Sequence, residues 1–162
     1  MNGWLLDTNV VAELARPQGA KTVLNWASAQ DQALSFLSIV TLGEYDKGPG
    51  NLPPGSPLRP VVAAGSAALA VRFAGRILKL TDPIVRRWGA LSGAVKRQTG
   101  HAPPVIDTML AATAIEHDLC LVTRNVRDVQ HSGVTYLNPW ERDGGTTQLG
   151  TGRTPPPHSQ PR

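Results

Sequence analysis

The sequence has little cysteine and no long apolar run, and both absences exclude whole classes of protein. Cys120 is the only cysteine among 162 residues, so neither a disulfide framework nor a cysteine-built zinc site is available. The first apolar run is short, reaches Asp7 within a few residues and has no basic leader before it. We therefore expect neither a signal peptide nor a membrane span, and a cytoplasmic protein.

The charge is moderately basic. Sixteen Lys and Arg residues stand against twelve Asp and Glu, which gives a net charge of +4 and a sequence pI near 9.7. Most of the cations are Arg, whose planar guanidinium matches phosphate oxygens in pairs. The cations are spread along the chain, so a partner such as a nucleic acid and a simple bias in composition explain the charge equally well.

Apolar runs alternate with helical patterns along the first 141 residues. Short buried strands are expected at residues 4–6, 33–39, 76–80, 119–123 and 134–137, and helices at 10–16, around 23–26, and at 39–47, 61–74, 82–100 and 105–117. Strands that alternate with helices predict an α/β protein with a parallel sheet covered on both faces. The tryptophans lie among apolar neighbours and are expected in the core or at interfaces.

Two segments are rich in Gly and Pro. Residues 48–65 hold five Pro and four Gly, which predicts a long loop or hinge rather than a helix. Residues 142–162 hold four Gly, four Pro and one large aliphatic residue, too little apolar surface to offset the entropy of ordering. We therefore expect one domain over residues 1–141, followed by a disordered tail.

Three acidic residues stand in strongly apolar surroundings: Asp7 in LLDTNVV, Glu44 in IVTLGE and Asp107 in VIDTML. A buried carboxylate needs a partner or a raised pKa, and the sequence offers few nearby cations. Asp7 follows the first strand, at the edge where open α/β sheets bind their ligands, and Asp107 opens a helix. A shared Mg²⁺ would satisfy all three, because this ion prefers carboxylate oxygens.

Each carboxylate also has a purely structural interpretation, which the pattern alone leaves open. Asp7 could cap the helix that follows it, Glu44 could lie on a solvated helix face, and Asp107 could offset a helix dipole. The four histidines have no metal-ligand spacing and are assigned no role.

Five segments in order resemble the PIN-domain ribonucleases of the VapC type, the toxins of type II toxin–antitoxin pairs. The segments are LLDTNVV (5–11), LSIVTLGE (37–44), VID (105–107) with AATA (111–114), LVTRNVRD (121–128) and LNPWE (137–141). The resemblance covers about residues 4–141. It implies a PIN-like α/β/α sandwich around a parallel sheet of four to five strands, and a homodimer.

The resemblance also implies an activity: Mg²⁺-dependent endonucleolytic cleavage of RNA, with Mn²⁺ as a substitute metal, and inhibition by a cognate VapB-like antitoxin. Asp7, Glu44 and Asp107 fall on the family's acidic positions as metal ligands and catalytic residues. The family often has an acid directly after Thr-Arg, where this chain has Asn125, so Asp128 becomes the fourth catalytic candidate. The break at Pro49-Gly50 is a further departure from the family's pattern.

In the expected mechanism, Mg²⁺ on Asp7 and Asp107 activates a water that attacks phosphorus, while Glu44 orients that water or acts as its base. Hydroxyl and amide side chains near the acids are expected to fix their rotamers, or else to bond nearby backbone groups: Thr8, Ser38, Thr123 and Asn125. Candidates for phosphate contact are Lys47, Arg124 and Arg127.

Two other functions remain open at this stage. A phosphatase of the haloacid dehalogenase type also places an aspartate after its first strand, but it needs Asp-x-Asp, and the third residue here is Asn9. A PIN fold with weakened catalysis could instead serve as an RNA- or protein-binding module.

Overall fold

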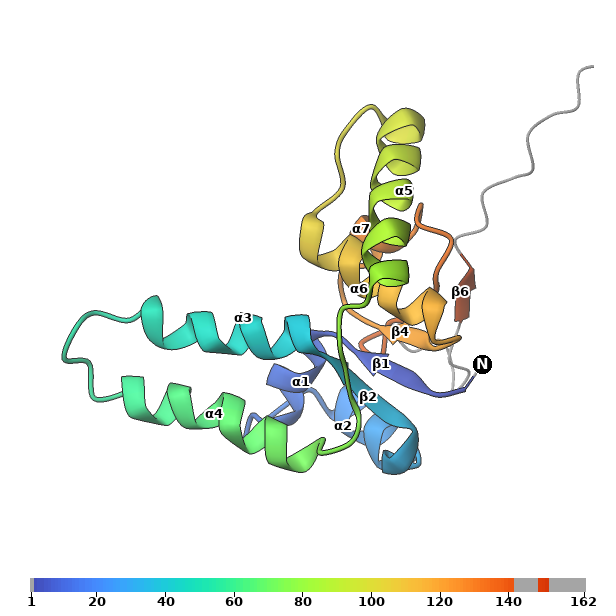
Figure 1. Cartoon of the computed structure of the whole chain (residues 1–162). Coiled ribbons are helices and arrows are strands. Elements are labelled where there is room, and N and C mark those ends of the chain that lie inside the picture. Colours follow the sequence, from blue (N-terminus) through green and yellow to red (C-terminus); the bar gives the residue numbers. More distant parts are fainter. Residues whose placement is uncertain (1, 142–148, 152–162) are drawn as a thin grey trace, which may run out of the picture.

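The protein is built on one twisted sheet with helices on both faces (Figure 1). The computed structural model describes residues 2–141 and 149–151. The sheet has the order β3-β2-β1-β4-β5-β6, in which five neighbouring strands are parallel and β6 is antiparallel to β5. The strands are β1 (Trp4–Leu6), β2 (Ser35–Ser38), β3 (Ile77–Leu78), β4 (Cys120–Val122), β5 (Thr135–Leu137) and β6 (Leu149–Thr151). The predicted α/β fold with a parallel sheet is confirmed.

Helices connect the parallel strands, because a parallel pair needs a crossover. They are α1 (Thr8–Leu14), α2 (Lys21–Ser28), α3 (Ile39–Gly50), α4 (Arg59–Arg72), α5 (Asp82–Thr99), α6 (Val105–Glu116) and the short α7 (Val126–Val129), with a 3₁₀ turn η1 (Gln32–Leu34) before β2. Capping follows the sequence: the Ser38 hydroxyl accepts from the Val40 amide, and Gly100 ends α5 at φ 81°. None of the helices in the described ranges is both long and apolar enough to cross a membrane.

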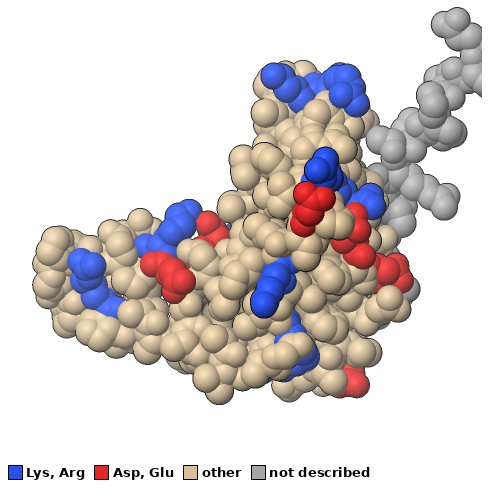
Figure 2. All heavy atoms as spheres, in the orientation of Figure 1, with Lys and Arg blue, Asp and Glu red and all other residues tan. Residues whose placement is uncertain are grey.

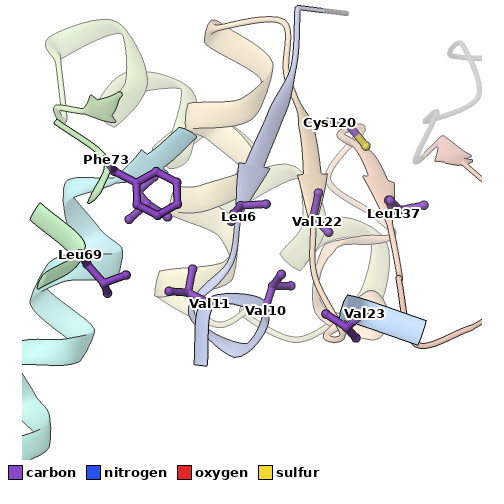
Figure 3. Close-up of a cluster of buried hydrophobic side chains, with 10 residues drawn as sticks. Leu6, Val10, Val11, Val23, Leu69, Phe73, Cys120, Val122 and Leu137 are labelled. Carbon is purple, nitrogen blue, oxygen red and sulfur yellow. The ribbon is translucent and has the colours of Figure 1, made fainter. Parts of the chain in front are cut away.

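The sheet divides the core into two layers, because successive strand residues point to opposite faces. Leu6 and Val122 face α1, α2 and α4 and pack with Val10 and Phe73, as Figure 3 shows. Leu5 and Leu121 face the other way, onto α6 and α7. β1 lies in the middle of the sheet, in register with β4 from Trp4 opposite Cys120 to Leu6 opposite Val122. The carboxyl ends of these two strands are therefore held side by side.

Three of the four tryptophans pack against the core, as expected from their apolar neighbours. Trp4 and Trp26 form an edge-to-face pair with ring centroids 5.5 Å apart, and both pack against the first core layer together with Trp140. Cys120 is fully buried in the same layer.

The loop predicted within residues 48–65 is shorter in the structure, while the helix predicted at 61–74 is present and begins two residues earlier. α3 runs through Pro49 to Gly50 and α4 begins at Arg59, so the connection spans only residues 51–58. The two helices lie side by side as a hairpin that projects from the sheet (Figure 1). A Cβ at Gly48 would lie 2.7 Å from Cγ1 of Val62, so this glycine permits close helix packing. Tertiary packing here outweighs the low helix propensity of Gly and Pro.

Part of the predicted disordered tail lies in the sheet. Leu149–Thr151 form β6 and pair with Thr135–Leu137 of β5. The other residues of that tail, 142–148 and 152–162, lie outside the described residues. A domain boundary near residue 141 remains a prediction.

Candidate functional site

A cleft of about 470 Å³ opens at the carboxyl ends of the central strands. Its polar lining comes from the turn after β1, from α3, from the start of α6 and from the segment after β4: Asp7, Thr8, Asn9, Glu44, Asp107 and Asn125. The cleft lies where open α/β sheets bind their ligands. The three acids singled out in the sequence therefore line one cleft.

Asp7 is the most buried of these acids, with a relative exposure of 5%. Its Oδ2 accepts a 2.6 Å hydrogen bond from the Thr123 hydroxyl and a 2.7 Å bond from Nδ2 of Asn9. Burial raises the pKa of Asp7, the nearby charge of Asp107 raises it further, and the bonds from Thr123 and Asn9 oppose these effects. The carboxylate is thus held in one orientation at an electrostatic cost.

Asp107 lies in the first turn of α6, where the helix dipole favours a negative charge. Its Oδ1 accepts a 3.0 Å hydrogen bond from Nδ2 of Asn125, and the backbone amide of Asn125 donates to the Thr123 hydroxyl oxygen over 2.9 Å. Within residues 2–141 and 149–151, neither Asp107 nor Asp7 has an ion pair. Two carboxylates therefore share the cleft without a neutralising cation from this part of the chain.

Glu44 lines the same cleft but is engaged elsewhere. Its Oε1 accepts a 2.8 Å salt bridge from Nζ of Lys47, one helical turn further along α3. In the described part of the chain, no three His, Cys, Asp or Glu side chains are close enough together to hold a metal directly. The cup of three converged carboxylates predicted from the sequence is therefore not formed in this arrangement.

The donor set of the cleft nevertheless suits a hard cation. Mg²⁺ keeps several waters and is usually held by only one or two protein carboxylates, which Asp7 and Asp107 supply. The Thr8 hydroxyl is buried and has no partner among the described residues, although it lines the cleft. The Thr8 hydroxyl and the two unneutralised carboxylates are thus polar groups of the cleft whose bonding capacity is not filled by the described residues.

The four residues expected to position the acids differ in what they contact. Thr123 bonds Asp7 directly, and Asn125 bonds Asp107 directly. Thr8 lines the cleft without a bond from its hydroxyl. Ser38 is buried, and its hydroxyl caps α3 through the Val40 amide, outside the cleft lining. Its bond is thus to the backbone, the alternative that the sequence left open.

Asn9 is a residue of the site that the sequence pattern did not predict, and it lies at the centre of the hydrogen-bond network. Its Nδ2 donates to Asp7 and, over 3.4 Å, to the Thr123 hydroxyl oxygen, while its Oδ1 accepts from the Arg124 amide. Its position two residues after Asp7 in Asp-Thr-Asn was the available signal. Asn9 thereby links the first turn of α1 to the loop after β4.

The three residues expected to contact phosphate, Lys47, Arg124 and Arg127, differ in the contacts that their side chains make. Lys47 is paired with Glu44, as described above, and the guanidinium of Arg124 lies 5.6 Å from the ring centroid of Trp140. Arg127 is exposed and, in the described ranges, makes no side-chain bond. Asp128, the fourth acidic candidate, lies outside the cleft lining and lines an adjacent cavity with Arg127. Burial and the charge of Asp107 raise the pKa of Asp128.

Comparisons with known proteins agree on one family. A model of the PIN domain matches residues 4–131. The toxin FitB of Neisseria gonorrhoeae is 30% identical over 136 residues, which are 84% of this chain and 97% of FitB. The VapC ribonuclease Y4jK of Sinorhizobium fredii is 29% identical over 137 residues, 85% of this chain and 97% of Y4jK. The crystal structure of FitAcB from Neisseria gonorrhoeae superposes with a TM-score of 0.75 at 29% identity, covering 86% of this chain and 99% of that one. The chain belongs to the PIN domain family.

Proposed function

We propose that the chain is a Mg²⁺-dependent endoribonuclease and the toxin of a VapBC-type toxin–antitoxin pair, with Mn²⁺ able to replace Mg²⁺. The observation that carries this proposal is the pairing of Asp7 and Asp107 in one cleft without a cation from the described chain. Related PIN proteins bear the names VapC ribonuclease and toxin FitB, which supports the reaction class and the biological role.

Electrostatics explain why a phosphodiester substrate needs a cation here. A phosphate that approaches Asp7 and Asp107 meets two like charges in a partly desolvated cleft, where repulsion is stronger than in water. A divalent ion on these two carboxylates would reverse the sign of the local field and supply a Lewis acid for the phosphodiester. Asp7 and Asp107 would hold the ion.

The side chains around the two acids fix their geometry before substrate arrives. Thr123 and Asn9 donate hydrogen bonds to the carboxylate of Asp7. The side chain of Asn125 donates to Asp107, and its backbone N–H donates to the Thr123 hydroxyl. Such supporting bonds set the orientation of carboxylate ligands. Glu44 also lines the cleft and would accept a proton from the attacking water. Its salt bridge with Lys47 would first have to open.

A toxin of this kind needs an inhibitor in its own cell. We extend to this chain the partner that the resemblance implies, a VapB-like antitoxin that blocks the cleft, together with a homodimeric state and a cytoplasmic location. Co-purification of the chain with the product of an adjacent short gene tests the partner. Sedimentation of the chain alone tests the dimer.

RNA cleavage is the experiment that tests the activity. The purified chain is incubated with total RNA and with short single-stranded RNA, in Mg²⁺, in Mn²⁺ and in EDTA. We expect endonucleolytic products with either metal and none in EDTA. Binding of RNA without cleavage would support the alternative of a PIN-fold binding module. Release of phosphate from a small phosphoester would support the phosphatase, which the PIN match and Asn9 in place of a second aspartate oppose.

A further inference from the structure

A second cavity, of about 250 Å³, lies directly beside the acidic cleft. It is formed where the end of α5, the segment 101–104 and α7 meet, and Pro104 lines both this cavity and the cleft. The two cavities are therefore neighbours on opposite sides of Pro104. We call the second one the Asp128 cavity.

The Asp128 cavity has apolar walls on one part of its lining and polar side chains on the other: Thr99, His101, Arg127, Asp128 and His131. Val95, Pro103 and Pro104 supply flat or aliphatic surface, while Asp128 and Arg127 supply one charge of each sign. No side-chain hydrogen bond or ion pair is made by Asp128 or Arg127 in the described part of the chain. These two charges therefore do not hold the fold together, and both are available to a ligand.

His101 adds a polar group with a defined orientation. Its Nδ1 lies 3.0 Å from the Thr99 carbonyl oxygen, which can only accept, so Nδ1 carries the proton. In the neutral ring, Nε2 is then left as a hydrogen-bond acceptor. The Asp128 carboxylate and Nε2 of His101 in this tautomer are therefore acceptors at the cavity, which is also lined by the guanidinium of Arg127 and by Thr99 and His131.

The size of the Asp128 cavity limits its ligand to a small group. Pockets for complete small-molecule ligands usually measure roughly 300–1,000 Å³, so this one suits a part of a larger ligand. A flat base between proline and valine surfaces fits its apolar walls. Among the RNA bases, guanine alone presents two adjacent N–H donors on its Watson–Crick edge, which match both oxygens of one carboxylate.

The surroundings of the Asp128 cavity favour a polyanion. Lys96 and Arg97 occupy the last turn of α5, and Figure 2 shows Lys and Arg side chains gathered at that tip of the molecule. Arg127 is permanently charged and exposed at the cavity, where a phosphate of an RNA strand could reach it. Positive charge at the entrance offsets the repulsion from the acids.

We propose that the Asp128 cavity is a nucleotide subsite that takes a guanine of single-stranded RNA next to the cleaved bond. Asp128 accepts hydrogen bonds from N1–H and N2–H of the base, and Arg127 binds the neighbouring phosphate. This inference rests on the proposed ribonuclease function. It gives Asp128 a role in base selection, whereas the resemblance implies a catalytic role.

The test compares RNA hexamers that carry guanosine, inosine or uridine at one position beside the cleavage site. Inosine lacks the N2 amino group of guanine and is otherwise the same. For the wild-type chain we expect kcat/KM to fall about tenfold from guanine to inosine, mainly through KM, and further for uracil. In Asp128→Asn the guanine and inosine substrates should be cleaved at rates within about twofold of each other. Arg127→Ala should raise KM for all three substrates with little change in kcat.

Asp82 and Arg86 provide matched controls, since they form an exposed ion pair at the opposite end of α5. Asp82→Asn and Arg86→Ala should leave the guanine preference unchanged. An equal loss of kcat on all substrates in Asp128→Asn, with the guanine preference retained, would overturn the inference and assign Asp128 to catalysis.

Equilibrium binding separates this inference from the proposed function. Fluorescence anisotropy of the same hexamers in EDTA should show the guanine preference of the wild-type chain and its loss in Asp128→Asn, even if no cleavage occurs. Cleavage in Mg²⁺ without any base preference would leave the ribonuclease intact and contradict the subsite. Equal binding of guanine and inosine hexamers by the wild type would contradict it as well.

Discussion

The hydroxyl of Thr123, just after β4, donates a 2.6 Å hydrogen bond to Oδ2 of Asp7, just after β1. The two strands are paired in register, so this bond joins residues that are 116 positions apart through adjacent carboxyl ends of the sheet. The same hydroxyl oxygen accepts from the amide of Asn125, whose side chain holds Asp107. Thr123 thus connects both carboxylates that we assign to the metal.

Replacing Thr123 with valine tests this connection, because valine keeps the shape and removes the hydroxyl. We expect Thr123→Val to lower kcat/KM for RNA by about 10- to 100-fold, the usual effect of losing a group that orients a metal ligand. The matched control is Thr113→Val: Thr113 is equally buried, but its hydroxyl bonds only the Met109 carbonyl within α6. Equal losses of activity in both variants would show that Thr123 acts only through stability.

The ionisation of Asp7 should oppose folding in the absence of metal. Its pKa is raised above 3.8, chiefly by burial, so the folded state binds this proton more tightly than the unfolded state. The free energy of unfolding therefore falls as the pH rises from 3.8 through the folded pKa. We expect Asp7→Asn to raise the free energy of unfolding at pH 7, where the wild-type carboxyl would otherwise ionise in its buried position.

Urea denaturation in EDTA between pH 3.5 and pH 8 measures this effect as the difference in free energy of unfolding between Asp7→Asn and wild type. The difference should grow with pH and then level off. Mg²⁺ should stabilise the wild-type chain and leave Asp7→Asn unchanged, since a ligand that binds only the folded state shifts unfolding. A difference that is constant with pH would contradict the assignment.

Lys47 should compete with the metal site for Glu44. Their salt bridge is largely exposed on the lysine side, and exposed pairs contribute only about 0–1 kcal/mol. We expect the free energy of unfolding of Lys47→Met to lie within about 0.5 kcal/mol of the wild-type value. It should also lower the Mg²⁺ concentration for half-maximal cleavage. Lys21→Met, on α2, is the control, and a higher Mg²⁺ requirement in Lys47→Met would show that Lys47 supports the site.

Cys120 should be chemically silent in the folded protein. Burial raises the pKa of its thiol to about 12, so the reactive thiolate is scarce and also inaccessible. We expect no reaction with Ellman's reagent at pH 8 in native buffer and one reacted thiol per chain in denaturant. Rapid labelling in native buffer would contradict the packing of β4.

Much of the fold follows from local sequence pattern. The strands are short apolar runs. Ser38 caps the start of α3, and Gly100 ends α5. Asp107 lies in the first turn of α6, where the helix dipole favours a negative charge. The hairpin of α3 and α4 was not predicted, because the proximity of Gly48 to Val62 is tertiary and no local propensity reports it.

The candidate site was predictable to a similar degree. Acids after apolar runs identified the cleft lining, since carboxyl ends of parallel strands meet at one edge. The pairing of Glu44 with Lys47 has helical i, i+3 spacing, yet sequence alone does not say whether Glu44 faces the lysine or the cleft. The Asp128 cavity needs two distant segments, residues 95–104 and 127–131, to converge, which only the fold can show.

In the proposed function, Asp7 and Asp107 jointly hold one divalent cation. The direct measurement is Mn²⁺ binding, by calorimetry or by the loss of the free-ion electron paramagnetic resonance signal, for wild type, Asp7→Asn, Asp107→Asn and the control Asp82→Asn. We predict that wild type and Asp82→Asn bind Mn²⁺, and that each of the other two variants loses at least about tenfold in affinity. Wild-type affinity in either Asp7→Asn or Asp107→Asn would contradict the account.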